Sequence, residues 1–260
     1  MRREEVKEYL DELCVRYNRE TFVPDDPVSV PHGFVRAEDI EIAGFLAATI
    51  AWGQRPTIVR NGRRMMELMD DAPYQFVTES QAADWDALMP FVHRTFNGGD
   101  FVYFVRALRH IYLHHGGLGG FFRTAYVRYG DLKPVLSDFR RLFFSPELEP
   151  LPRHARHLPS VDKGAACKRL NMFLKWMVRQ DDNGVDFGLW SDAIPASALY
   201  LPLDVHTANV SRMLGLLTRK QNDWRAVEEV TGVLRSFDAT DPVRYDYALF
   251  CAGIYRELSV

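Results

Sequence analysis

The sequence predicts an all-α protein, on three observations. Apolar residues recur at helical spacing in most segments, alternating β-branched strands are absent, and prolines and glycines separate one helical segment from the next. With 260 residues, of which 47% are hydrophobic, the chain is long enough for a large core or for two lobes. We therefore expect many helices joined by loops, in an arrangement other than a simple bundle.

The first half of the chain follows this plan. A charged amphipathic helix is expected over residues 3–18, and a loop rich in proline over residues 22–36. Glu38 and Asp39 then open an apolar helix, because acidic residues suit the positive end of the helix dipole. Further helices are expected at 56–70, 84–90, 100–115, 118–129 and 134–143.

The second half begins with a loop over residues 145–162, where four prolines exclude a long helix. A strong helix is expected from Lys163 to about Arg179, because apolar residues repeat there at i, i+4, i+7, i+8 and i+11. Residues 180–203 are expected to form an irregular insertion. The remaining helices are expected at 205–217, 223–236 and 242–257.

Three domains are expected from this order. Residues 1–36 form an N-terminal helix and loop that pack on the C-terminal lobe. Residues 37–145 form a first helical lobe. Residues 146–260 form a second helical lobe that carries a hairpin, the Lys163 helix and the insertion.

Composition and spacing exclude several classes of protein. The three cysteines are widely separated and form no C-x-x-C pair, so no zinc or iron–sulfur centre, and no other cofactor, is expected. His154, His157, Asp204 and His206 could be combined into a metal site, but their spacing does not require one. The longest apolar run is too short to span a bilayer and no signal peptide is recognised, so a cytoplasmic location without a membrane partner is expected. The sequence leaves the oligomeric state open.

Charge is unevenly distributed. A formal net charge of −3 argues mildly against a nucleic-acid protein, which needs a basic surface. From Arg153 to Arg179, however, basic residues far outnumber the one acid, Asp162. An acidic protein can therefore still present one basic face.

Lys163 and Asp204 are the strongest candidates for chemistry. Each follows a turn and precedes a helix, so both side chains are expected at helix N-termini. The dipole at that end, together with desolvation, favours the neutral amine of Lys163, and Asp204 has the position of an N-cap with a fixed orientation. An amine nucleophile with a carboxylate partner can cut an N-glycosidic bond through a Schiff base. A solvated lysine and a plain N-cap are the structural alternatives.

Three segments around these residues resemble the helix–hairpin–helix DNA glycosylase superfamily, and are nearest to its 8-oxoguanine DNA glycosylase branch. They are residues 163–167, 203–206 and 247–252. The resemblance lies in their order: a lysine after a hairpin, an aspartate that opens the next helix, and an aromatic residue on a late helix. The whole chain also resembles an uncharacterised bacterial family of glycosylase-like proteins, through residues 51–55 and 168–179.

The resemblance implies a two-lobed fold with a helix–hairpin–helix element and a role for each matching residue. Lys163 would attack the sugar C1′ and Asp204 would stabilise the developing charge. The flipped base would lie between Cys167 and Phe250, with Asp246 reading its edge. For the DNA itself, the implied contacts are made by Gln54, Arg55, Lys168 and Arg169. The implied activity is removal of an oxidised purine from damaged double-stranded DNA, with lyase activity.

Three departures from the family pattern keep alternatives open. The family hairpin carries Gly-x-Gly, but here Ser160 and Asp162 take those positions, and a carboxylate repels phosphate. Lys163 and Asp204 are also 41 residues apart, about twice the usual separation, and the chain is acidic overall. A glycosylase-like protein that binds DNA or a modified nucleotide without cutting it is therefore a second hypothesis. Lysine chemistry on a small nucleoside-like ligand is a third.

Overall fold

The computed structural model describes residues 1–255 and confirms the all-α class. Within those residues, the strands amount to one two-residue antiparallel pair, β1 (Val92–His93) and β2 (Phe96–Asn97). The chain divides into two compact units. The continuous unit is Pro24–Pro159, and the split unit combines Met1–Val23 with the chain from Ser160 onward.

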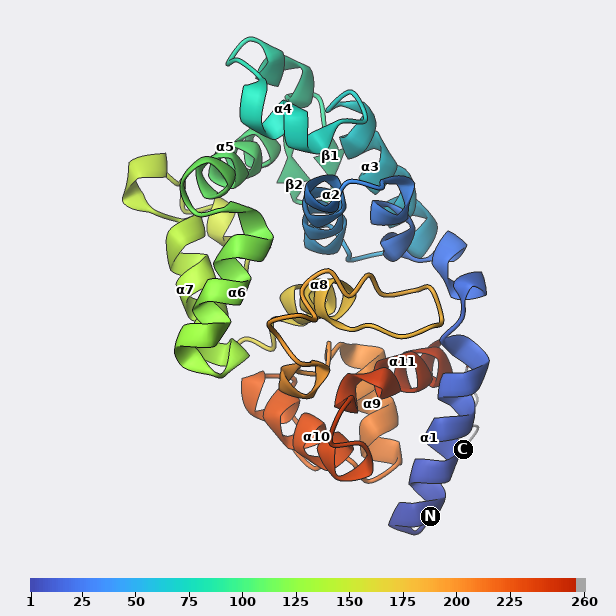
Figure 1. The fold of residues 1–260 in the computed structure, drawn as a ribbon. Helices are drawn as coiled ribbons and strands as arrows, with labels where there is room; N and C mark the ends of the chain where they lie inside the picture. The colour runs from blue at the N-terminus through green and yellow to red at the C-terminus, as the bar shows by residue number, and fades with distance from the viewer. Residues whose placement is uncertain (256–260) are drawn as a thin grey trace. The chain divides into compact units, whose positions relative to one another are not determined.

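The continuous unit contains six α-helices (Figure 1). They are α2 (Ala37–Thr49), α3 (Arg55–Glu67), α4 (Pro73–Glu79), α5 (Gly98–His114), α6 (Gly117–Tyr129) and α7 (Leu132–Phe143). Phe45 of α2 packs against Phe104 of α5 and against Phe139 and Phe143 of α7, with ring centres 5.5–6.0 Å apart. These aromatic side chains are fully buried, so they form the centre of this unit's core.

The described part of the split unit, residues 1–23 and 160–255, contains five α-helices. They are α1 (Arg3–Tyr17), α8 (Lys168–Val178), α9 (Val205–Met213), α10 (Trp224–Phe237) and α11 (Tyr245–Tyr255). Helices α1 and α9 both pack on α11, so the N-terminal helix completes a core built otherwise from the C-terminal part of the chain (Figure 1). Residues 179–204 between α8 and α9 carry only turns and one short 3-10 segment, as expected for the insertion.

The sequence prediction and the structure differ in several places. Helix α4 and the small hairpin were not predicted, and the helix expected at 84–90 is a 3-10 helix over Asp84–Leu88. Short elements carry too few residues for a periodic pattern, although Pro73 at the first helical position is a start signal. The units divide at Val23 and Ser160, where the sequence had suggested boundaries at 36 and 145.

Candidate functional site

The helix expected from Lys163 begins five residues later, at Lys168. Residues 161–164 form a turn in which Gly164 has a left-handed φ of 77°, and Cys167 has a φ of 48°. Two left-handed residues prevent a right-handed helix from starting before Lys168. Ala165, between them, forms a β-bridge with Asp223 instead. We call residues 160–167 the hairpin segment.

Lys163 therefore lies on the turn of the hairpin segment rather than on a helix. Its side chain is exposed, and among residues 1–255 it forms no side-chain hydrogen bond or ion pair. The prediction that Lys163 stands at a helix N-terminus is wrong. Gly164 and Cys167 take left-handed conformations, so α8 begins only at Lys168.

Lys168 takes the position that the sequence had suggested for Lys163. It is the first residue of α8, and its Nζ lies 3.9 Å from Oδ2 of Asp204. The two side chains remain 24% and 23% exposed, so a ligand can reach both. An amine and a carboxylate thus meet at the N-termini of two helices, with Lys168 as the amine.

Asp204 is the N-cap that the sequence predicted for α9. Its Oδ1 accepts a 2.9 Å hydrogen bond from the backbone N–H of Thr207, while its backbone is extended. Oδ2, the oxygen nearest Lys168, takes no part in the cap. The cap therefore fixes the orientation of the carboxylate and leaves one oxygen directed at the amine.

Cys167 and Phe250, expected on either side of a base, differ in exposure. Cys167 is buried and is the residue immediately before α8. Phe250 is partly exposed on α11. The position of Cys167 at the start of α8 places its backbone next to Lys168.

Asp246, expected to read a base edge, is buried and paired. Its Oδ2 accepts a 2.6 Å hydrogen bond from Nζ of Lys175, whose side chain is 3% exposed. The same ammonium lies 3.6 Å from the centre of the Tyr247 ring. Burial lowers the pKa of Lys175, but the nearby carboxylates of Asp246 and Asp186 outweigh burial and the pKa is raised. Asp246 is therefore a counter-ion within the protein.

A second buried charge, Arg179, extends this network. Its guanidinium bonds Asp186 at 2.9 Å and Asp241 at 2.8 Å, and it also contacts Asp181. Tyr247 donates a 2.8 Å hydrogen bond to the same oxygen of Asp186. Burial raises the pKa of Asp186, and the cations Lys175 and Arg179 oppose that rise. The sequence showed these basic residues as a possible phosphate-binding face, whereas α8 turns Lys175 and Arg179 inward.

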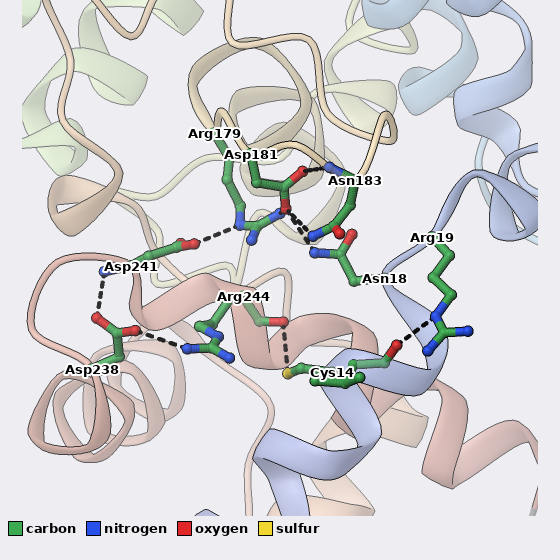
Figure 2. A pocket seen from close by; sticks show the side chains of 10 residues that line it. Cys14, Asn18, Arg19, Arg179, Asp181, Asn183, Asp238, Asp241 and Arg244 are labelled. Atoms are coloured by element: carbon green, nitrogen blue, oxygen red, sulfur yellow. Dashed lines mark hydrogen bonds and ion pairs between the residues drawn. The ribbon is translucent and has the colours of Figure 1, made fainter.

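A cavity of about 410 Å³ lies beside this network (Figure 2). Figure 2 shows the Arg179 and Arg244 side chains interleaved with the carboxylates of Asp181, Asp238 and Asp241. Arg244 bonds Asp238 at 3.2 Å. Three arginines and three aspartates line the cavity. Burial raises the pKa of the Cys14 thiol in the same wall to about 12, which keeps it protonated.

Of the residues expected to contact DNA, Arg169 shares α8 with Lys168. Its side chain is partly buried, and desolvation lowers the pKa of its guanidinium to about 10, so it remains charged at neutral pH. Gln54 and Arg55 belong to the continuous unit, where Gln54 is the exposed N-cap residue of α3 and Arg55 its first residue. Arg55 lines a second cavity of about 500 Å³ along α3.

His154 and His157, weighed as metal ligands, flank a buried carboxylate. Nε2 of His157 lies 3.2 Å, and Nε2 of His154 3.8 Å, from the oxygens of Asp100, which is fully buried. Arg153 also bonds Asp100, at 2.8 Å. Across residues 1–255, no group of three or more His, Cys, Asp or Glu residues is arranged to hold a metal ion.

Within the described part of the chain, no helix has the length and apolar character needed to cross a membrane.

Comparison with known proteins gives one match. No curated protein and no solved structure matches the chain. Residues 26–255 match a family described as "Protein of unknown function (DUF2400)", which covers most of both units. The chain belongs to the DUF2400 family.

Proposed function

We propose that the protein is a DNA N-glycosylase with lyase activity in which Lys168 supplies the amine and Asp204 the carboxylate. The observation that carries the proposal is the 3.9 Å separation between Nζ of Lys168 and Oδ2 of Asp204. The order of elements also supports it: hairpin segment, lysine at the start of α8, long insertion, and aspartate capping α9. This order is the one that the resemblance to the helix–hairpin–helix glycosylases implies, with Lys168 in the role first given to Lys163.

The proposed reaction follows from these two groups. The ammonium of Lys168 passes a proton through one water to Asp204, since 3.9 Å is too long for a direct transfer. The neutral amine then attacks the sugar C1′ as the N-glycosidic bond breaks, and the departing base takes the proton from Asp204, which becomes a carboxylate again. The nitrogen then gives one proton to O4′ as the C1′–O4′ bond breaks, which leaves a protonated imine between the lysine nitrogen and C1′. Loss of a C2′ proton from this imine expels the 3′ phosphate in the lyase step. The fixed Asp204 carboxylate stabilises the positive charge that develops on the sugar.

The proposed substrate is damaged double-stranded DNA that carries an oxidised purine. A damaged pair costs least to open, which favours extrusion of the altered base. In this proposal the base lies by Cys167 and Phe250 of the split unit. The insertion of residues 179–204 loops out between α8 and α9, so the 36-residue separation of Lys168 and Asp204 is compatible with the pair.

The test is borohydride trapping on a duplex that contains 8-oxoguanine. We expect the wild-type protein to become covalently linked to DNA, Lys168→Gln to abolish the linkage, and Lys163→Gln to retain it. Lys163 is the matched control because it is exposed and lies on the turn just before α8. If trapping is lost with Lys163→Gln and kept with Lys168→Gln, Lys163 is the nucleophile. If the wild-type protein traps none of the lesions in an oxidised-purine panel, the glycosylase–lyase proposal is wrong.

A non-catalytic DNA-binding protein is the second candidate. The exposed Asp162 in the hairpin segment favours it, because a carboxylate there opposes the phosphate contact that a duplex-cutting relative would make. This candidate requires binding that weakens steeply with salt and yields no product. A mobility-shift titration at several salt concentrations, run beside the trapping assay, separates the two candidates.

A further inference from the structure

The cavity along α3 is lined mainly by one face of that helix. Arg55, Val59, Arg63 and Glu67 form one row at i, i+4, i+8 and i+12, and Pro56 and Arg60 lie beside it. Pro24 and Asp25 close the other side. The cavity, which we call the arginine groove, has a volume of about 500 Å³.

The residues that line the groove carry a positive formal charge, whereas the continuous unit as a whole does not. The continuous unit holds fifteen Lys and Arg against sixteen Asp and Glu, whereas α3 alone holds four Arg against one Glu. The single acid of α3, Glu67, is paired with Arg64 at 3.0 Å. Positive charge is therefore concentrated on this helix, and Asp25 is the other carboxylate that lines the groove.

Two of the three groove arginines are available to a ligand. Arg60 and Arg63 are exposed, and within residues 1–255 neither forms a side-chain hydrogen bond or ion pair. Like-charged side chains at i and i+3 repel each other, so their closeness costs free energy unless an anion lies between them. Guanidinium groups bind phosphate oxygens in paired hydrogen bonds, which makes phosphate the matching anion.

The length of the groove favours a strand over a single phosphate. Arg55 and Arg63 are eight residues apart, which is about 12 Å along a helix. One phosphate group is much shorter than this, while successive phosphates of a nucleic-acid strand span it. We propose that the arginine groove binds the phosphate backbone of a nucleic-acid strand through Arg60 and Arg63, with Arg55 at its end. The proposal rests on the proposed function for the identity of the polyanion, but it uses residues outside the Lys168–Asp204 pair.

The experiment measures binding of an undamaged, fluorescein-labelled DNA duplex by anisotropy as a function of salt. We expect Arg60→Gln with Arg63→Gln to weaken binding at least tenfold at low salt, and to reduce the slope of log K against log salt by about 2, since each phosphate contact contributes about 0.9. The matched control is Arg128→Gln with Arg156→Gln, which removes the same charge from exposed positions of the same unit. Thermal melting should show all variants folded.

A gain of binding gives a second readout. Glu67→Gln removes a repelling carboxylate from the groove and releases Arg64, so it should strengthen duplex binding severalfold. Equal losses in the groove and control variants, or wild-type affinity in the groove variant, would overturn the proposal. Displacement of the duplex by a stoichiometric amount of pyrophosphate would overturn the strand in favour of a small phosphate ligand.

The outcomes for this groove and for the reaction are separable. If the wild-type protein traps damaged DNA and the groove variant binds as tightly as wild type, the groove proposal fails and the proposed reaction stands. If the groove variant loses binding and the wild-type protein traps no DNA, the groove proposal stands and the reaction fails. If the wild-type protein does not bind duplex even at low salt, both are wrong.

Discussion

The pair of Lys175 and Asp246 shows how one residue's role depends on its surroundings. In the sequence, Lys175 belongs to a basic run and Asp246 to a late helix, and both could be surface residues. In the structure they form a 2.6 Å buried contact over the ring of Tyr247. Each charge is tolerated in the core because opposite charges compensate it, with Asp246 and Asp186 both acting on Lys175.

Breaking this pair should be costly. We expect Asp246→Asn to reduce the free energy of unfolding by about 3–5 kcal/mol, because it leaves the Lys175 ammonium buried without its counter-ion. The double variant Lys175→Met with Asp246→Leu removes both charges and should lose much less. Urea unfolding of the two variants beside wild type measures the difference. A single variant no less stable than the double variant would show that the pair contributes little.

Helix α9 shows that the role of a residue also depends on the helix it begins and on the neighbour it faces. Its N-cap is Asp204, so one side chain both begins the helix and faces Lys168. The two roles use different oxygens, which allows them to be separated by substitution. Asparagine caps a helix about as well as aspartate does, but it carries no charge.

Asp204→Asn and Asp204→Ala should therefore differ in stability and agree in activity. We expect Asp204→Asn to keep the wild-type free energy of unfolding within about 0.5 kcal/mol, and Asp204→Ala to lose about 1 kcal/mol through the cap. Both should reduce borohydride trapping strongly, because neither supplies the carboxylate. Chemical denaturation and trapping on the same preparations check this. Full trapping by the asparagine variant would remove Asp204 from the proposed reaction.

At the scale of the whole molecule, buried histidines link stability to pH. His93 accepts a 2.8 Å hydrogen bond at Nδ1 from Asn61, and His154 accepts one of 3.1 Å at Nδ1 from the Leu151 backbone. Burial lowers the pKa of both rings, and for His154 it outweighs the opposing effect of Asp100. The unfolded chain therefore takes up protons before the folded protein does.

Stability should consequently fall in mild acid. Both folded pKa values lie below the unfolded value of about 6.5, so the stabilisation is fully present above that pH. It is lost as the pH falls from about 6.5 toward the folded pKa values. We expect His154→Gln to flatten part of this dependence, and His206→Gln, at an exposed position, to leave it unchanged. Melting temperatures measured from pH 7.5 to 5 test the prediction, and identical slopes for all three proteins would contradict it.

The helices were the most predictable part of the molecule, for a physical reason. Their apolar residues repeat with the period of the helix, and a chain of this composition must bury them, so α5, α6 and α7 lie within two residues of their expected bounds. The hairpin segment could not be predicted in the same way. Gly164 and Cys167 take left-handed conformations there, and the bridge from Ala165 to Asp223 joins residues far apart in the sequence.

The sequence by itself determined the all-α class, the order of the helices, the loop between α8 and α9, and Asp204 as the cap that opens α9. These features depend on residues that are close in sequence. Tertiary structure decided that Lys168, not Lys163, faces Asp204, and that Asp246 is buried with Lys175. Those contacts join residues 36 and 71 positions apart, and such pairs are set by how the helices pack rather than by the pattern along any one of them.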